Sequence, residues 1–147
     1  TGCLETLSSQ RAVLERARRL SRSDPGWALS GKSVTHATLL QAFRADDPVA
    51  VRVVLESAAP LGRVVGAVIG TLGARDIVLV GPMAEFGERW LETIRAEAHR
   101  SALPLLVERS TIHLGRTGDD VVELGAAALL MTSELGLMLA AGVARTA

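Results

Sequence analysis

The sequence holds few of the side chains that cross-link a fold or stack on nucleic-acid bases. Cysteine occurs once, as Cys3, tyrosine is absent, and two phenylalanines and two tryptophans supply the aromatic rings. A single cysteine excludes an internal disulfide and is typical of a reducing compartment, so we expect a cytoplasmic protein. The scarcity of aromatic side chains argues against a platform on which nucleic-acid bases stack.

Neither sign of charge is in excess, because sixteen lysines and arginines balance sixteen aspartates and glutamates. This balance argues against a dedicated nucleic-acid surface within these residues. No apolar run is expected to reach transmembrane length, since Gly66, Gly70 and Gly73 interrupt the longest one. The first residues also lack the pattern of a signal peptide. We therefore expect no membrane partner.

What the sequence does contain is enough apolar material for a core, 48% of its residues. Residues 76–80 form a short β-branched run that predicts a buried strand, and Gly81 and Pro82 end it. Residues 84–100 then show helical spacing, and a second strand is expected within residues 105–114. Strands joined through a helix run parallel and side by side, so the expected class is α/β, rich in helix, with one β-α-β unit.

Apolar residues recurring at helical spacing predict four further helices. They cover residues 4–20, 36–44, 48–72 and 121–137. Thr35 and Asp47 are typical N-cap residues for the second and third of these, and Pro48 fits the first helical position. The recurring glycines of the third are expected to let it approach a sheet or another helix closely.

Two of these helices contain unusual features. Pro60 lies inside the third and is expected to kink it, or to split it near Ser57. The last is apolar nearly all round, so every side of it must be buried. We infer that a missing part of the chain, or a second subunit, covers it.

Residues 26–33 match the phosphate-loop pattern G-x-x-x-x-G-K-[ST], with Lys32 as the lysine. That motif requires a buried strand before its first glycine, and the arginine-rich residues 18–24 cannot form one. We interpret the match as chance in a polar linker. The charged side chains of the helix over residues 4–20 are interpreted as its solvated face, with a nucleic-acid patch as the alternative; they are Arg11, Glu15, Arg16, Arg18 and Arg19. His36, His99 and His113 lie on different elements, and no nucleophile–base pair is evident, so we expect no catalysis from these residues.

Short motifs in a fixed order resemble the ROK family of sugar kinases and sugar-responsive repressors. The first is Gly2-Cys3-Leu4-Glu5-Thr6-Leu7-Ser8-Ser9, which resembles the end of the family signature C-x-C-G-x-x-G-C-x-E-x-x-A-S. Next, Asp46-Asp47-Pro48-Val49-Ala50 resembles a Gly-Asp-x-x-Ala helix start, and Leu61-Gly62 resembles the start of L-G-x-x-x-A-x-x-x-N-x-x-x-P. Last, Val78-Leu79-Val80-Gly81 resembles the V-V-L-G-G strand, and Leu124-Gly125-Ala126-Ala127-Ala128 resembles L-G-A-A.

The resemblance implies a two-lobed fold of the actin-like ATPase type, of which residues 1–147 are the carboxyl-terminal part of the sugar-binding domain. It implies that Cys3 binds zinc together with ligands further upstream; the alternative is a free thiol, since four ligands are needed. It also implies that Glu5 binds a sugar hydroxyl; the alternative is a first-turn glutamate favoured by the helix dipole. Gly81 would lie near nucleotide phosphates only in a kinase.

Two functions follow from the resemblance. The preferred one is the ligand-sensing and oligomerising region of a repressor, with a sugar or sugar phosphate as effector and DNA contacts through an upstream helix–turn–helix. The alternative is part of an ATP-dependent hexose or amino-sugar kinase, whose catalytic aspartate would lie upstream. Pro82 replaces a glycine of the kinase motif and removes an amide donor, which disfavours ATP. No cofactor is expected within these residues alone.

Overall fold

A computed structural model describes residues 2–115 and 121–134 of the 147-residue chain. Its elements are α1 (Leu4–Ser8), α2 (Gln10–Ser23), α3 (His36–Arg44), α4 (Pro48–Leu72), β1 (Asp76–Leu79), the 3-10 helix η1 (Pro82–Phe86), α5 (Glu88–Ser101), α6 (Pro104–Val107), β2 (Thr111–Leu114) and α7 (Val121–Glu134). The strands β1 and β2 pair in parallel, with Ile77 opposite Ile112. The predicted α/β class and the parallel pair are therefore confirmed.

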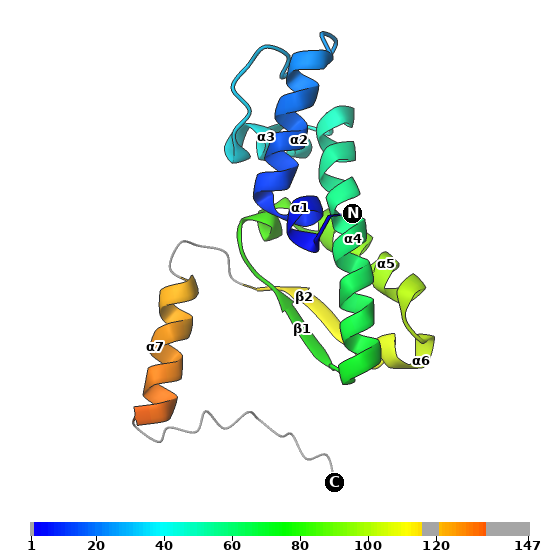
Figure 1. Cartoon of the computed structure of the whole chain (residues 1–147), viewed down its shortest axis with the longest axis vertical. Helices are drawn as coiled ribbons and strands as arrows, with labels where there is room; N and C mark the ends of the chain where they lie inside the picture. The colour runs from blue at the N-terminus through cyan, green and yellow to red at the C-terminus, as the bar shows by residue number, and fades with distance from the viewer. Residues whose placement is uncertain (1, 116–120, 135–147) are drawn as a thin grey trace.

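Helix α4 is the long central helix of the fold, with α2 and α3 around its first half, α1 beside its middle, and α5 and α6 beside its second half (Figure 1). Asp47 caps its start as predicted, because the carboxylate accepts hydrogen bonds from the amides of Val49 and Ala50 at 3.0 and 2.8 Å. Gly73 ends the helix in the left-handed conformation that glycine adopts at low cost. The helix is continuous through Pro60, so the predicted split near Ser57 is wrong.

By length and composition alone, α4 is long and apolar enough to cross a membrane. Its most apolar stretch has a mean hydropathy of 1.5. This contradicts the expectation that no run reaches such a length, because the glycines interrupt the apolar side chains without ending the helix. Buried core helices satisfy the same criterion, and 44% of this stretch is buried against the rest of the fold. Val54 and Ile69, for example, are fully buried in the core.

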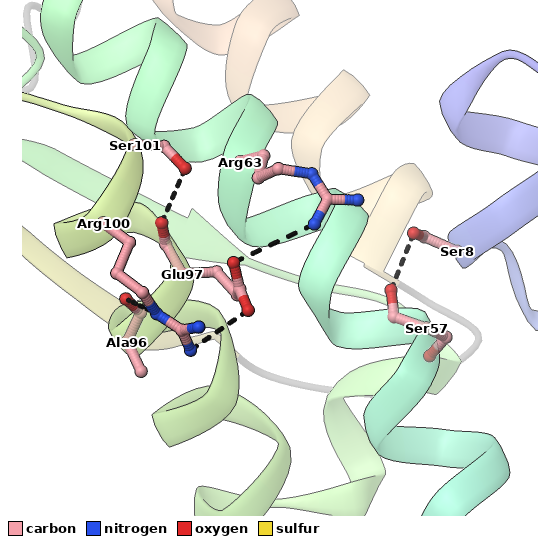
Figure 2. A network of polar contacts seen from close by, with 7 residues as sticks. All are labelled: Ser8, Ser57, Arg63, Ala96, Glu97, Arg100 and Ser101. Atoms are coloured by element: carbon pink, nitrogen blue, oxygen red, sulfur yellow. Dashed lines mark hydrogen bonds and ion pairs between the residues drawn. The ribbon is translucent and has the colours of Figure 1, made fainter.

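Close contact between α4 and α5 occurs at glycines. A Cβ atom placed on Gly62 would lie 2.6 Å from the carbonyl oxygen of Ile94, and one on Gly66 would lie 2.9 Å from that of Ala98. Both helix backbones therefore approach to a distance that excludes any larger residue, which confirms the predicted role of these glycines. Beside this contact the largely buried carboxylate of Glu97 bridges the two helices (Figure 2); its oxygens lie 3.9 Å from Arg63 and 3.1 Å from Arg100.

Two sequence-based boundaries are corrected by the structure. The helix expected over residues 4–20 is two helices, because Ser9 is extended and its hydroxyl accepts a hydrogen bond from the amide of Ala12, the N-cap geometry of a new helix. The helix expected from residue 84 begins at Glu88, after η1. The strand predicted within residues 105–114 is confirmed as β2 at the end of that range, because Pro104 starts the short helix α6 before it.

Burial also differs from the prediction at the sheet. Val78 and Val80 face away from the core and are about half exposed, so the first strand is buried on one face only. Along α7, large apolar side chains are exposed: Leu124, Leu129, Leu130 and Met131. Within the described residues nothing covers them, so the inferred covering partner stays a prediction. Residues 135–137, the expected end of this helix, lie outside the described residues.

Replacing Gly62 with alanine tests the close contact. The added methyl group would overlap the backbone of α5, so we expect Gly62→Ala to lower the free energy of unfolding by about 1–3 kcal/mol in denaturant titrations. Gly70 lies in the same helix with open space, to at least 4 Å, around the place that an alanine methyl group would take, so Gly70→Ala is the matched control. It should raise stability by up to about 1 kcal/mol. Equal effects of the two changes would contradict the prediction.

Candidate functional site

The break between α1 and α2 creates a groove of about 300 Å³. Because Ser9 is extended, α2 leaves α1 at an angle and the surface between them is open. The groove is lined by residues from both helices and from the break: Glu5, Thr6, Ser9, Arg11, Ala12 and Glu15. Most of these side chains are polar and half or fully exposed, as a site that binds a hydroxylated ligand from solvent requires.

The charged residues of the groove differ in whether they have a partner within the protein. The guanidinium of Arg11 donates to a carboxylate oxygen of Glu15 at 3.0 Å. This hydrogen bond, and then the charge of Glu15, raise the pKa of Arg11, and the charge of Glu5 adds to the effect. Arg11 therefore stays cationic and engaged with Glu15. Among the described residues no group donates a hydrogen bond to the Glu5 carboxylate, which leaves its oxygens available to a ligand.

A single buried hydroxyl fixes α1 on the core. Ser8 is the buried residue of this five-residue helix, and its Oγ donates to the carbonyl oxygen of Ser57 at 2.7 Å (Figure 2). The acceptor lies in the turn of α4 that Pro60 disturbs, because proline offers no amide to the carbonyl of Glu56 and its ring crowds the preceding turn. Since Glu5 lies one helical turn before Ser8, this bond also sets the position of the Glu5 carboxylate.

Cys3 precedes α1 and is exposed. Its carbonyl accepts hydrogen bonds from the amide and the hydroxyl of Thr6, at 3.0 and 2.8 Å, which start the helix. No group of three histidine, cysteine or acidic side chains that could hold a metal occurs in the described part of the chain. Cys3 supplies one donor of the four that a structural zinc requires, so a zinc site depends on ligands from elsewhere.

Gly81 lies two residues after the end of β1 and has a φ of 97°, a conformation that favours glycine. Pro82 follows it as the first residue of η1, so the amide that a kinase-like loop would offer there is missing. The groove that contains Glu5 includes neither Gly81 nor Cys3. The structure therefore does not bring the three predicted site residues into one pocket.

Residues 26–33, which match the phosphate-loop pattern, do not have the strand-before-loop structure that this motif requires. Helix α2 runs to Ser23, so no strand precedes Gly26, and the amino group of Lys32 donates to the carbonyl oxygen of Ala28 at 2.8 Å. The interpretation of this segment as a nucleotide-binding loop is thus excluded by its local fold.

Sequence reasoning misses three residues of this region. It places Arg11 and Glu15 only on a solvated face, although their spacing of four residues on a helix is typical of an ion pair. Ser8 carries no local signal, because its partner is 49 residues away in the sequence.

Comparison with known proteins assigns this chain to a family. The ROK family model matches residues 1–133, so this chain belongs to the ROK family. A crystal structure of a ROK family transcriptional regulator, a homologue of the Escherichia coli MLC protein, superposes with a TM-score of 0.77 at 21% identity, covering 86% of this chain and 32% of that one. The predicted family is thereby confirmed, and the matched part of this chain shares its fold with that regulator.

A curated relative is similar in sequence as well. The chain is 34% identical over 94 residues to the uncharacterized protein YphH of Escherichia coli (strain K12), an alignment that covers 63% of this chain and 24% of that protein. The chain therefore spans about a quarter to a third of the proteins it matches.

Removing the Ser8 hydroxyl tests its role in holding α1. Ser8→Ala leaves a buried carbonyl without this donor, so we expect the free energy of unfolding to fall by about 1–3 kcal/mol. The substitution should also speed up the exchange of the α1 amides with solvent by more than that of the α4 amides. Ser101→Ala is the control, because that exposed hydroxyl bonds only within its own helix; it should change stability by less than about 0.5 kcal/mol. Unchanged exchange in α1 would contradict the proposed anchoring.

Proposed function

We propose that this chain is the ligand-sensing region of a ROK transcriptional regulator, in which Glu5 binds hydroxyl groups of a sugar effector. The observation that supports this is the Glu5 carboxylate, exposed in a polar groove and without a donor among the described residues. An ionised carboxylate accepts hydrogen bonds from two neighbouring hydroxyls, and such charge-assisted bonds are stronger than neutral ones. Free carboxylate oxygens in a hollow are what a sugar-binding glutamate needs.

The proposed function extends beyond the groove. DNA would be bound by an upstream helix–turn–helix, and zinc, held by Cys3 and upstream ligands, would fix the loop that leads into α1. We further propose a homo-oligomer, supported by the exposed apolar side chains of α7. A regulator is preferred to a kinase because Pro82 removes an amide beside Gly81; the similarity to a ROK transcriptional regulator supports the same choice.

Changing the charge of Glu5 without changing its shape tests the proposal. In the full-length protein, Glu5→Gln loses a charge-assisted acceptor worth about 1.5–3 kcal/mol. Sugar affinity, measured by calorimetric titration with a panel of hexoses, amino sugars and their phosphates, should fall by roughly ten- to a hundred-fold. The melting temperature should change little.

Glu92→Gln provides the matched control, since Glu92 is an exposed glutamate of α5 outside the groove. Its sugar affinity should equal that of the unmodified protein. A helix-dipole role for Glu5 gives the reverse pattern, a small loss of stability with sugar affinity unchanged. That result would remove Glu5 from the site.

A further inference from the structure

A second hollow, of about 260 Å³, lies at the other end of α2 from the Glu5 groove. Its walls come from the last turns of α2 and from the loop that leads to α3. The residues are Arg18, Ser21, Arg22, Gly31, Lys32, Ser33 and Val34. Part of the phosphate-loop match thus lines a basic hollow, although its fold is not that of a nucleotide-binding loop.

Positive charge in this hollow is not neutralised by the residues that the structure describes. Its walls contain three cations, Arg18, Arg22 and Lys32, and no acidic residue. None of the three forms an ion pair with a carboxylate in the described part of the chain. Two other arginines of the same helix, Arg11 and Arg16, do form such pairs. Like charges gathered without counter-charges repel each other, so an anion bound among them is favoured.

Hydrogen bonds hold two of these cations in place. The Nε of Arg18 donates to the carbonyl oxygen of Val34 at 3.0 Å, and the Nζ of Lys32 donates to that of Ala28 at 2.8 Å. The terminal nitrogens of Arg18 and two hydrogens of the Lys32 ammonium remain available as donors. Because the long side chains are already partly ordered, an anion that binds them loses less conformational entropy.

The loop itself is fastened to α2. The buried hydroxyl of Ser21 donates to the carbonyl oxygen of Leu29 at 2.7 Å, and the carbonyl oxygen of Ser21 accepts the amide of Gly31 at 3.1 Å. Gly31 has a φ of 67°, which turns the chain back toward the helix and places Lys32 and Ser33 on the wall of the hollow. The hollow is therefore a feature of an ordered loop.

We propose that this hollow binds the phosphate group of a small phosphate ester. Arg18, Arg22 and Lys32 supply the charge, and the Ser33 hydroxyl supplies a further donor. Guanidinium groups match the geometry of phosphate oxygens, and a volume of about 260 Å³ admits one phosphate with part of its ester group. This site is separate from the Glu5 groove and does not depend on the function proposed for it.

Calorimetric titration of the full-length protein with inorganic phosphate and with phenyl phosphate tests the proposal, at an ionic strength held constant with sodium chloride. We expect saturable binding of both, at one site per chain. Arg22→Gln and Lys32→Gln should each weaken it at least tenfold, since each removes a charged donor. Arg19→Gln, which removes a neighbouring charge of α2 outside the hollow, should leave the affinity within twofold.

Other outcomes overturn the proposal. Absence of saturable phosphate binding, or an equal loss of affinity in Arg19→Gln, would show that the charges act only as a diffuse surface potential. Binding of a random duplex DNA that free phosphate does not displace, and that Lys32→Gln weakens, would assign the hollow to a DNA backbone instead. Melting curves of each variant ensure that a loss of affinity is not a loss of fold.

Discussion

The close contact between α4 and α5 is the constraint on which the rest of the structure depends. Gly62 and Gly66 allow the two backbones to meet, and the Glu97 carboxylate bridges them at the edge of the contact. Helix α5 is also the crossover between the two strands, and its Arg95 guanidinium donates to the carbonyl oxygen of Ile112 in β2 at 2.9 and 2.7 Å. The position of the sheet thus follows from how closely α5 packs on α4.

Helix α4 also determines where the candidate site lies. Its first half supports α1 through the bond from Ser8 to the carbonyl of Ser57, close to Pro60. From there the chain turns at Ser9 into α2, which separates two hollows of opposite character. In one, the charged residues are Glu5, Glu15 and a single arginine; in the other, every charged residue is a cation. The buried hydroxyl of Ser8 and the extended Ser9 between α1 and α2 therefore organise the polar surface of this region.

Local signals in the sequence predict those features that depend on local chemistry. The caps at Thr35 and Asp47 are predictable because capping depends on a few adjacent residues. The parallel pair is predictable because a strand, a helix and a strand in sequence restrict the topology. The break at Ser9 is missed, since the apolar spacing of a helix continues across it and only the serine hydroxyl favours a new start.

Long-range features cannot be predicted in the same way. The acceptor of the Ser8 hydroxyl and the gathering of Arg18 with Lys32 depend on how the chain packs, and neither leaves a periodic pattern. Of the predicted site residues, Glu5 is a prediction that rests on a family motif. Its groove becomes visible only with the angle between α1 and α2.

The two-stranded sheet has a consequence for handling the protein. Within the described residues β1 and β2 pair only with each other, so each strand has an edge of backbone donors and acceptors with no strand beside it. Such edges, next to the half-exposed Val78 and Val80, are templates for pairing with another chain. A preparation of these residues alone would therefore be prone to aggregation by strand addition.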